Sequence, residues 1–546
     1  MATVQVSPLI YSRFRGIREH NGVNSGGEIS AIKCENVELF QSDIGNEVGI
    51  KSIEGNTLYS AMATGYNIIG MFKSEQKLSD SSDTFKTYFL IYAENNEQGN
   101  LYYLDDNNQR QSLLTGLTRT GKCNGITMTS TAYDVFVFTN GVEAYSISFA
   151  ESPYPKKTKI TDGVTPATDR KGNPINFLAM ANFNGFLVVA TKYGVRASCQ
   201  NDIYTWNKQT TGAADNWDID YSKPVTALYA YTGGLFIFTG DTTDFITGTP
   251  NITSNRLLNT AGVGCYDYQS IVKHDTFLFF YDNNQKNIYY IQNIDNGQTR
   301  PSGPIAKEIQ SYFRNVETFK MYSCIYNSRN EIWCIINNKV MVYDYFQQEW
   351  TERHYPKQIN TVLMIKNAVY VSTTDRVTIE NNTTLYSAIY QVNTGDTFGG
   401  EIINSIYETC FINVGSNSNL KKQKTPLLIV LNDTFTNDFF IQLIVNGKEK
   451  SPKRIILKSK AKGFFYKEPE EGEEAPDSMY FYDADTGKGA FFSDQNPYSK
   501  TVKEVSTPQT WYTLGIRIYT KELKQGFCIN SIELKNIKAK LKTKGR

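Results

Sequence analysis

The sequence predicts an all-β fold made of small antiparallel sheets that repeat along the chain, and three observations lead to this prediction. A unit of turn, apolar strand, turn and second strand recurs with spacings of 50, 50, 49, 42, 55 and 37 residues, beginning at Thr84, Asp134, Asn184, Gly233, Asp275, Asn330 and Asn367. The first strand of each unit is a near-continuous apolar run, which is typical of a strand buried on both faces. The 36 Tyr, 31 Phe and 39 Gly residues favour strands and turns. Such repeated sheets are best buried by a radial arrangement, a β-propeller of six or seven blades.

The propeller is expected to occupy residues 61–395, preceded by an N-terminal arm at 1–60 that belongs to no repeat. Because a ring must join its ends, the simplest interpretation of the arm is a surface strand that completes the first or last blade. The alternative is an arm that crosses to a neighbouring subunit. The second strand of each unit alternates better, as at 340–344, and should lie nearer an exposed edge. One helical interruption is predicted, with Ile305, Ile309 and Phe313 on one stripe.

Residues 396–546 are predicted to form a second, sandwich-like β domain, with strands near 401–414, 426–432, 439–447, 511–519 and 527–535. This part carries 23 Lys+Arg against 18 Asp+Glu, whereas residues 1–395 carry 33 against 37. It contains a charged insertion at 448–477, in which a basic stretch with Glu449 as its single acid precedes the acidic residues 468–477. The insertion is interpreted either as a solvated loop flanked by its own counter-charge or as a docking element for a neighbouring subunit.

Several classes of protein are disfavoured by the composition. With 56 Lys+Arg against 55 Asp+Glu, no whole-chain field argues for nucleic acid or a membrane. No apolar run approaches the length of a membrane span, and the N-terminal residues lack the charged and apolar regions of a secretory signal. The eight cysteines show no C-x-x-C spacing and fall mostly in apolar strands. We therefore expect reduced core thiols and neither disulfides nor a zinc site.

No catalytic, cofactor or metal site is predicted. The histidines are far apart and beside turns, as is typical of surface or turn positions: His20, His274 and His354. Nucleophile-elbow, zincin, Walker and dinucleotide motifs do not occur in the sequence. A propeller glycosidase would need a carboxylate pair facing the axis. The available pairs are Asp218 with Asp220 and Asp241 with Asp244, but Asp is also a common turn former.

The basic tail at 535–546 is the remaining positive signal, since six of its twelve residues are basic and none is acidic. Alternating lysines would share one face of an extended strand and could hold phosphates. The candidate DNA-channel or interface residues are Lys538, Lys540, Lys542, Lys544 and Arg546. The alternative is a disordered, solubilising end of the chain.

Four segments together suggest a family: 262–282, 304–313, 331–350 and 514–534. In pattern and order they resemble the packaged-DNA stabilisation proteins of short-tailed bacteriophages, which are β-propeller proteins related in design to tail nozzles. The resemblance covers residues 180–395 and the last 35 residues. The Asn-, Lys-, Ile- and Tyr-rich composition is compatible with an AT-rich genome such as that of a crAss-like phage.

The resemblance implies a non-enzymatic structural protein of the virion tail, assembled in the cytoplasm of the host bacterium. It implies a homohexameric ring at the distal end of the portal and tail that closes the DNA channel and opens for genome ejection. Other phage tail and portal ring proteins would be its partners. The basic tail adds an expected contact with packaged DNA that is independent of sequence, and the composition argues against a membrane partner. Two other classes stay open: a carbohydrate-binding surface propeller, whose aromatic platforms the Tyr residues could supply, and a propeller glycosidase or lyase.

Overall fold

The computed structural model of the 546-residue chain divides into two compact units, Glu54–Glu401 and a second unit made of Met1–Ile53 with Ile402–Arg546. The structure describes all residues except 1–2, 20–27, 42–46, 78–83, 131–132, 152–153, 161–174, 207–214, 232–233, 249–254, 293–300, 327–328, 380–381, 413–419, 433–434, 459–481, 484–487, 490–499 and 541–546.

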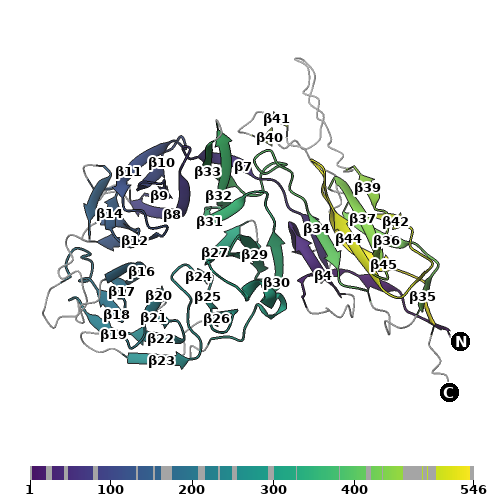
Figure 1. Cartoon of the computed structure of the whole chain (residues 1–546), viewed down its shortest axis with the longest axis horizontal. Helices are drawn as coiled ribbons and strands as arrows, with labels where there is room; N and C mark the ends of the chain where they lie inside the picture. The colour runs from purple at the N-terminus through teal and green to yellow at the C-terminus, as the bar shows by residue number, and fades with distance from the viewer. Residues whose placement is uncertain are drawn as a thin grey trace, which may run out of the picture. The chain divides into compact units, whose positions relative to one another are not determined.

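The unit Glu54–Glu401 is a β-propeller, in which the described strands form seven small antiparallel sheets arranged in a ring (Figure 1). The first four blades comprise β8 (Asn67–Lys77), β9 (Phe85–Glu94), β10 (Gly99–Leu104) and β11 (Arg110–Leu117); β12 (Asn124–Ser130), β13 (Tyr133–Thr139), β14 (Ala144–Ser148) and β15 (Lys156–Lys159); β16 (Ile175–Phe183), β17 (Phe186–Thr191), β18 (Gly194–Ala197) and β19 (Asp218–Asp220); and β20 (Val225–Tyr231), β21 (Gly234–Thr239), β22 (Thr242–Thr247) and β23 (Asn255–Ala261). The other three comprise β24 (Ile271–His274), β25 (Phe277–Asp282) and β26 (Asn287–Gln292); β27 (Phe319–Tyr326), β28 (Arg329–Ile336), β29 (Lys339–Asp344) and β30 (Glu349–Arg353); and β31 (Gln358–Ile365), β32 (Ala368–Ile379), β33 (Asn382–Gln391) and β7 (Thr57–Ala61).

The repeated sequence units coincide with the second and third strands of the blades, from β9 and β10 to β32 and β33. The prediction that their apolar runs are buried on both faces is confirmed, because every residue of β17, β21 and β25 is buried. The expectation of a more exposed following strand is wrong for β29, in which Val340–Tyr343 are buried. The reason is β30, which pairs along the outer side of β29 and is itself buried.

The ring is closed by a strand from the N-terminal part of the chain. Strand β7 pairs antiparallel with β33, with Ala61 opposite Ala388 and Thr57 opposite Gln391. The inner strand β31 of this last blade contacts β8 of the first. The prediction that part of the arm at 1–60 completes a blade is therefore confirmed for β7, which supplies the ladder partner that β33 would lack at the sheet edge.

Polar side chains connect the inner strands of neighbouring blades. Asn360 Nδ2 donates to Asn67 Oδ1 at 3.0 Å across the last and first blades, and Asn124 Nδ2 donates to the Leu178 carbonyl at 2.7 Å across the second and third. Lys320 Nζ donates to the Asn360 carbonyl at 3.2 Å, and burial lowers the pKa of this lysine. These side chains satisfy polar groups near the axis of the ring while they hold adjacent blades together.

The predicted helical interruption is a 3-10 helix, η1 (Lys307–Phe313), with non-helical backbone angles at Ile309. Ile309 and Phe313 are buried as the stripe predicts, and the Phe313 ring lies 5.6 Å from that of Tyr281. Ile305 precedes the helix and is half-buried; its carbonyl accepts a hydrogen bond from Trp350 Nε1 at 3.2 Å. The apolar stripe therefore identifies the packed face but not the type of helix.

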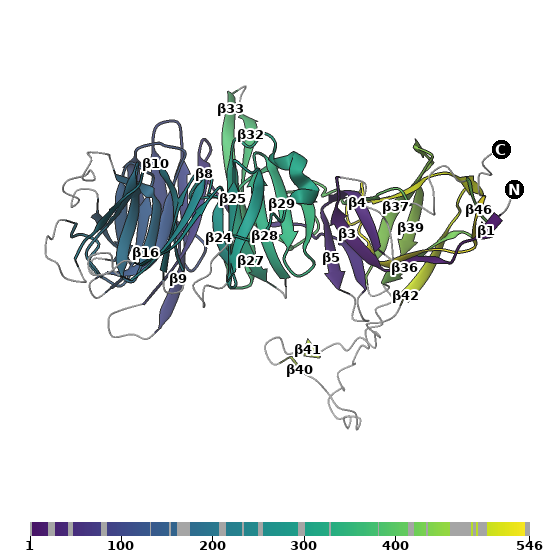
Figure 2. The ribbon, with the colours of Figure 1, turned by 90° about the horizontal axis from the view of Figure 1, so that it is seen from below.

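The second unit is an all-β, sandwich-like domain built from both ends of the chain (Figure 2). Its N-terminal strands are β1 (Thr3–Gln5), β2 (Leu9–Tyr11), β3 (Arg13–Ile17), β4 (Glu28–Glu35), β5 (Val37–Gln41) and β6 (Val48–Ser52). Its C-terminal strands are β34 (Ile406–Thr409), β35 (Leu420–Gln423), β36 (Leu427–Asn432), β37 (Asn437–Val445), β38 (Lys448–Glu449), β39 (Lys453–Leu457), β40 (Tyr482–Asp483), β41 (Lys488–Gly489), β42 (Lys500–Val505), β43 (Thr510–Trp511), β44 (Leu514–Tyr519), β45 (Cys528–Leu534) and β46 (Ile537–Lys540).

The pairing in this unit mixes the two ends of the chain. Strand β4 pairs with β34, β6 pairs with β45, and β2 pairs with β45 as well. Among the described strands, β3 and β4 form a parallel pair. The expectation of a separate N-terminal arm at 1–60 is thus corrected: its first 53 residues belong to the same unit as the C-terminal domain, because their buried positions Phe14, Ile29 and Ile50 complete its core.

All eight cysteines are buried and none forms a disulfide. Four of them lie in strands, whereas Cys123, Cys199, Cys265 and Cys410 lie outside the strands, so the expectation that most fall in strands is wrong. Burial raises the pKa of the Cys123 thiol to about 12, so this thiol stays protonated and unreactive at neutral pH.

Candidate functional site

The basic tail continues the second unit as strand β46, which lies between β1 and β35 in a four-stranded sheet whose last strand is β43. Ile537 and Ala539 are buried, whereas Lys538 between them is exposed. Lys540 is the last residue of the strand. Of the candidate residues of the tail, only the side chain of Lys538 is described, and Lys542, Lys544 and Arg546 lie outside the described residues.

Strand β35 adds basic residues that the sequence interpretation missed. Lys422 is exposed and stands directly opposite Lys538 in the antiparallel register, and Lys424 is exposed just beyond the end of β35. Directly opposite residues have Cβ atoms about 5 Å apart. The basic residues Lys421, Lys422 and Lys424 are visible in the sequence, but only the register of the strands shows that β35 pairs with β46 of the basic tail.

The neighbouring Lys421 serves the core of the sheet. It is buried on the opposite face, where its Nζ donates to the Tyr512 carbonyl at 2.8 Å and lies 5.7 Å from the centre of the Trp511 ring. Burial lowers the pKa of this lysine. Lys421 therefore stabilises the sheet and is separate from the exposed lysines. We call these exposed lysines the basic face: Lys422, Lys424 and Lys538.

Like charges placed opposite each other across strands are unfavourable for folding, and an anion with several negative groups would remove that cost. A flat row of ammonium groups can neutralise phosphates one by one without reading bases. The basic face is therefore a candidate interface for a polyanion, with the contact made by exchangeable point charges and not by a bidentate clamp.

The charged insertion at 448–477 is described only as far as Lys458. In this part Arg454 binds Asp438 through two hydrogen bonds of 2.8 Å, and Glu449 accepts a hydrogen bond from Arg517 of β44 at 2.7 Å. The hydrogen bonds with Arg454 hold the pKa of Asp438 below its usual range. The acidic stretch 468–477, which is the counter-charge expected for the insertion, lies outside the described residues.

The carboxylates considered for hydrolysis do not face the axis of the ring as a pair. Asp218 and Asp220 lie on β19, the outermost strand of their blade, and Asp218 Oδ1 is 3.7 Å from Arg196 Nε. Asp241 is paired with Lys223, whose hydrogen bond lowers the pKa of this carboxyl group, and Asp244 is buried in β22. Among the described residues, no group of three or more His, Cys, Asp or Glu side chains is placed to hold a metal ion.

Two of the three histidines are described, and one departs from the expectation of a surface or turn position. His354 is exposed, but His274 is fully buried at the end of β24, with its Nδ1 atom 2.9 Å from Ser323 Oγ. Burial lowers the pKa of His274. Its neighbours are the rings of Phe279 and Tyr345, so the role of this histidine is to pack between blades.

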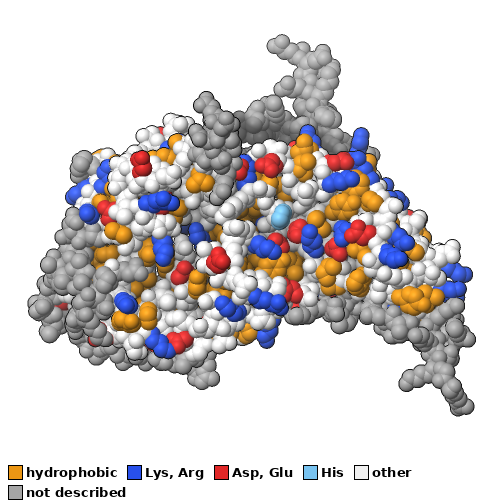
Figure 3. Space-filling view, in the orientation of Figure 1, with side chains coloured by type: hydrophobic (Ala, Val, Ile, Leu, Met, Phe, Trp, Pro, Cys, Tyr) orange, Lys and Arg blue, Asp and Glu red, His pale blue; other side chains and the backbone are white. Residues whose placement is uncertain are grey.

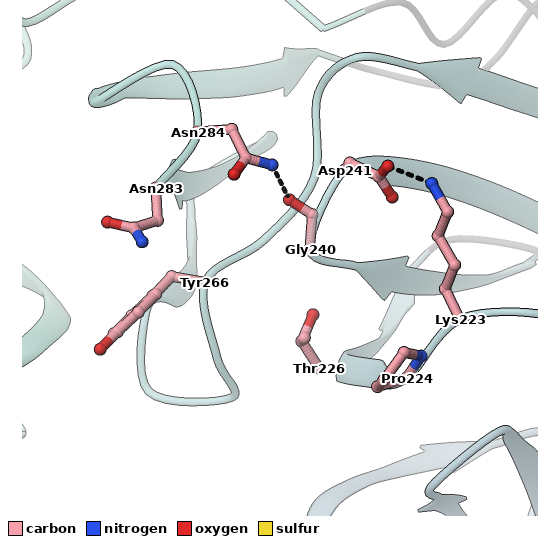
Figure 4. Close-up of a pocket in the computed structure, with 8 residues that line it drawn as sticks. All are labelled: Lys223, Pro224, Thr226, Gly240, Asp241, Tyr266, Asn283 and Asn284. Carbon is pink, nitrogen blue, oxygen red and sulfur yellow. Dashed lines mark hydrogen bonds and ion pairs between the residues drawn. The ribbon is translucent and has the colours of Figure 1, made fainter.

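A shallow cavity of about 350 Å³ lies between the fourth and fifth blades (Figure 4). Its wall carries the Lys223–Asp241 ion pair on one side and the Tyr266 ring with Asn283 on the other. Asn284 Nδ2 donates to the Gly240 carbonyl at 2.7 Å, and Tyr266 Oη donates to the Glu317 carbonyl at 3.0 Å. These hydrogen bonds connect loops of neighbouring blades, which makes the cavity part of the seam between them.

The surface shows no single-sign field on the face seen in Figure 3, where basic and acidic side chains are interspersed. No helix in the described part of the chain is long and apolar enough to cross a membrane. Charge-based recognition by this protein therefore has to be sought in local groups such as the basic face.

Comparison with known proteins adds little to this picture. No protein-family model and no curated protein matches the sequence. Among solved structures, the CNH domain of AfRom2 is 9% identical, with a TM-score of 0.34, over 62% of this chain and 98% of that domain. The N-terminal domain of Nup159 is 11% identical, with a TM-score of 0.29, over 62% of this chain and 98% of that domain. The fold assignment therefore rests on the seven sheets themselves.

Proposed function

We propose that this protein is a structural component of a short phage tail that forms a ring of six identical copies, closes the DNA channel and opens for genome ejection. The sequence resemblance to packaged-DNA stabilisation proteins supports the assignment to a tail. The arrangement of the chain supports a load-bearing role. Catalysis is not part of the proposal.

The observation that carries the proposal is the double passage of the chain between its two units. The chain enters the propeller after residue 53 and leaves it at 401, so the propeller is inserted into the second unit. The two passing segments are hydrogen-bonded to each other: Gly55 N donates to the Gly395 carbonyl and Thr394 N to the Gly55 carbonyl, both at 2.7 Å. Asn56 N donates to the Thr397 carbonyl at 2.8 Å.

Aromatic packing fixes the second of these segments in the propeller. The Phe398 ring is stacked on Tyr355 at 5.1 Å and on Tyr390 at 4.6 Å, and Phe398 is fully buried. A force that pulls on the connection between the units is shared by the two chain segments that link them. The propeller can release these segments only if the hydrogen bonds between them and the packing of Phe398 break together. Such a design suits a part that transmits force when a tail ejects DNA.

Ring formation and tail association are tested on the full-length protein. We expect a hexamer by native mass spectrometry and light scattering, either for the protein alone or after addition of the portal and tail-ring proteins of the same phage. Electron microscopy of virions should place the propeller at the distal end of the tail. A protein that stays monomeric under both conditions and is missing from purified virions would contradict the proposal.

A further inference from the structure

A cavity of about 660 Å³ lies at the seam where the last blade meets the first. It is lined by Tyr59 on the closing strand β7, by the start of β9, by the turn between β10 and β11, and by the turn between β31 and β32. Its volume falls within the range of about 300–1,000 Å³ that is usual for small-molecule sites. The proposed tail ring assigns no role to this cavity.

Aromatic rings form one wall of the cavity. Tyr59 lies 4.7 Å from Tyr370 and 6.0 Å from Phe89 between ring centres, and Phe89 lies 5.3 Å from Tyr370. Tyr59 Oη donates to Asn108 Oδ1 at 2.6 Å, which fixes the orientation of the ring. Burial raises the pKa of Tyr370 to about 12, so its hydroxyl keeps its proton.

Phe85 extends this wall at the beginning of β9, with 57% of its surface exposed. An aromatic ring that remains exposed beside an ordered aromatic cluster provides a flat apolar platform. Lys77 Nζ lies 5.8 Å from the centre of the Phe85 ring.

The polar wall of the cavity carries no net charge, because Lys86 and Lys366 balance Asp105 and Asp106. The Asp106 carboxylate accepts a hydrogen bond from Lys86 Nζ at 2.7 Å. The Asp105 carboxylate is used by its own turn, since it accepts from Gln109 N at 2.8 Å and from Gln111 Nε2 at 2.8 Å.

Neutral hydrogen-bonding groups complete the lining, namely the Thr87 hydroxyl and the Asn367 amide in the exposed turn before β32. Both acids are engaged within the protein, so a bound cation would find no free carboxylate among them. A purely apolar ligand would leave this polar rim without partners.

We propose that the seam cavity binds a neutral saccharide. A sugar ring presents C–H groups on one face, which pack on aromatic rings such as Phe85 and Tyr370, and hydroxyl groups at its edge, which pair with amides, hydroxyls and carboxylates. Both kinds of wall are present here, and the balanced charges favour an uncharged ligand. The proposal is independent of the tail ring and needs only the propeller.

Binding at this place has a mechanical consequence, since the ligand contacts both sides of the ring closure. Tyr59 and Tyr370 belong to the last blade, whereas Phe85 and Lys86 belong to the first. A ligand that binds only the folded, closed ring stabilises it by mass action. Saccharide binding should therefore raise the melting temperature of the propeller.

The test uses the full-length protein and a panel of maltose, cellobiose, lactose, chitobiose and mannobiose, with a heparin tetrasaccharide as the acidic probe. Saturation-transfer NMR and calorimetry should show binding of at least one neutral disaccharide with a dissociation constant of about 0.1–10 mM, the weak affinity expected for an open site. Phe85→Ser and Asn367→Ala should each weaken this binding by about two- to tenfold.

Phe346→Ser is the matched control, because Phe346 is 66% exposed in the turn between β29 and β30, away from the seam. It should leave affinity and the ligand-induced rise in melting temperature unchanged. Three results would overturn the proposal: no neutral disaccharide bound at about 10 mM, preferential binding of the heparin probe, or equal affinity of the Phe85→Ser variant and the parent protein.

Discussion

Replacing Lys422 and Lys538 by glutamine should change DNA binding and stability in opposite directions. The two residues are exposed and directly opposite each other on β35 and β46, so each stands beside a like charge. If both ammonium groups neutralise phosphates of DNA, each contact contributes about −0.9 to the slope of log affinity against log salt. Removing both makes that slope shallower by about 1.8.

This change has a measurable size. Between about 50 and 200 mM salt, the parent protein should lose about 12-fold more of its affinity than the Lys422→Gln, Lys538→Gln variant. At the same time the free energy of unfolding should rise by about 0.2–1 kcal/mol, because the cross-strand repulsion is removed. The assay is fluorescence anisotropy with short labelled duplexes of two unrelated sequences, which should bind equally well, followed by urea unfolding.

Lys450→Gln is the control, since Lys450 is an exposed lysine of the same unit that lies beyond the turn after β37. It should leave the salt slope unchanged. An equal slope for the parent and the double variant would refute the role of the basic face in DNA contact. A loss of stability in the double variant would refute the reasoning about repulsion between the two lysines.

Three further predictions concern the fold. Gly125→Ala should lower the free energy of unfolding by about 1–3 kcal/mol in urea denaturation, because the added Cβ would stand 2.2 Å from Cζ of the buried Phe136. Gly303→Ala is the control: a Cβ at this position would meet no atom within 4 Å, so the variant should be as stable as the parent protein. Burial holds the pKa of His274 below its usual 6.5, so the unfolded chain takes up a proton that the folded protein does not, and the free energy of unfolding should fall as the pH decreases below about 6.5. The variant His274→Asn should reduce this pH dependence in thermal melts recorded at several pH values. An identical pH profile for the variant and the parent protein would exclude His274 as the source. Non-reducing mass spectrometry should find all eight cysteines reduced in the native protein, since all are buried and none forms a disulfide in the structure. Any native intrachain disulfide would disprove this.

The propeller could be predicted from the sequence because each repeated unit is formed by residues that are close together in the chain. A two-strand hairpin with a continuous apolar run is encoded within about 20 residues, and the burial of such runs follows from their composition. The predicted strands near 426–432, 439–447 and 511–519 are likewise present as β36, β37 and β44. The type of the helix at 307–313 was not accessible in this way, because an apolar stripe reports which side chains are packed and not the backbone hydrogen bonds.

The seam cavity and the basic face could be predicted only in part, since both depend on strand register. The lysines at 421, 422 and 424 and those of the tail are visible in the sequence, but their meeting depends on the pairing of β35 with β46 over more than 100 residues. The aromatic wall likewise needs Tyr59, Phe85 and Tyr370, which come together only when β7 joins β33.

Local periodicity and composition therefore predicted the all-β class, the repeated blades and the buried thiols, because each depends on residues close in sequence. The assignment of residues 1–53 to the C-terminal unit, the closure of the ring by β7 and the burial of His274 came from contacts between distant segments. These contacts could not be predicted from the sequence because an edge strand presents the same unpaired N–H and C=O groups to any strand that could pair with it. Which strand fills that place depends on how the whole chain buries its apolar faces.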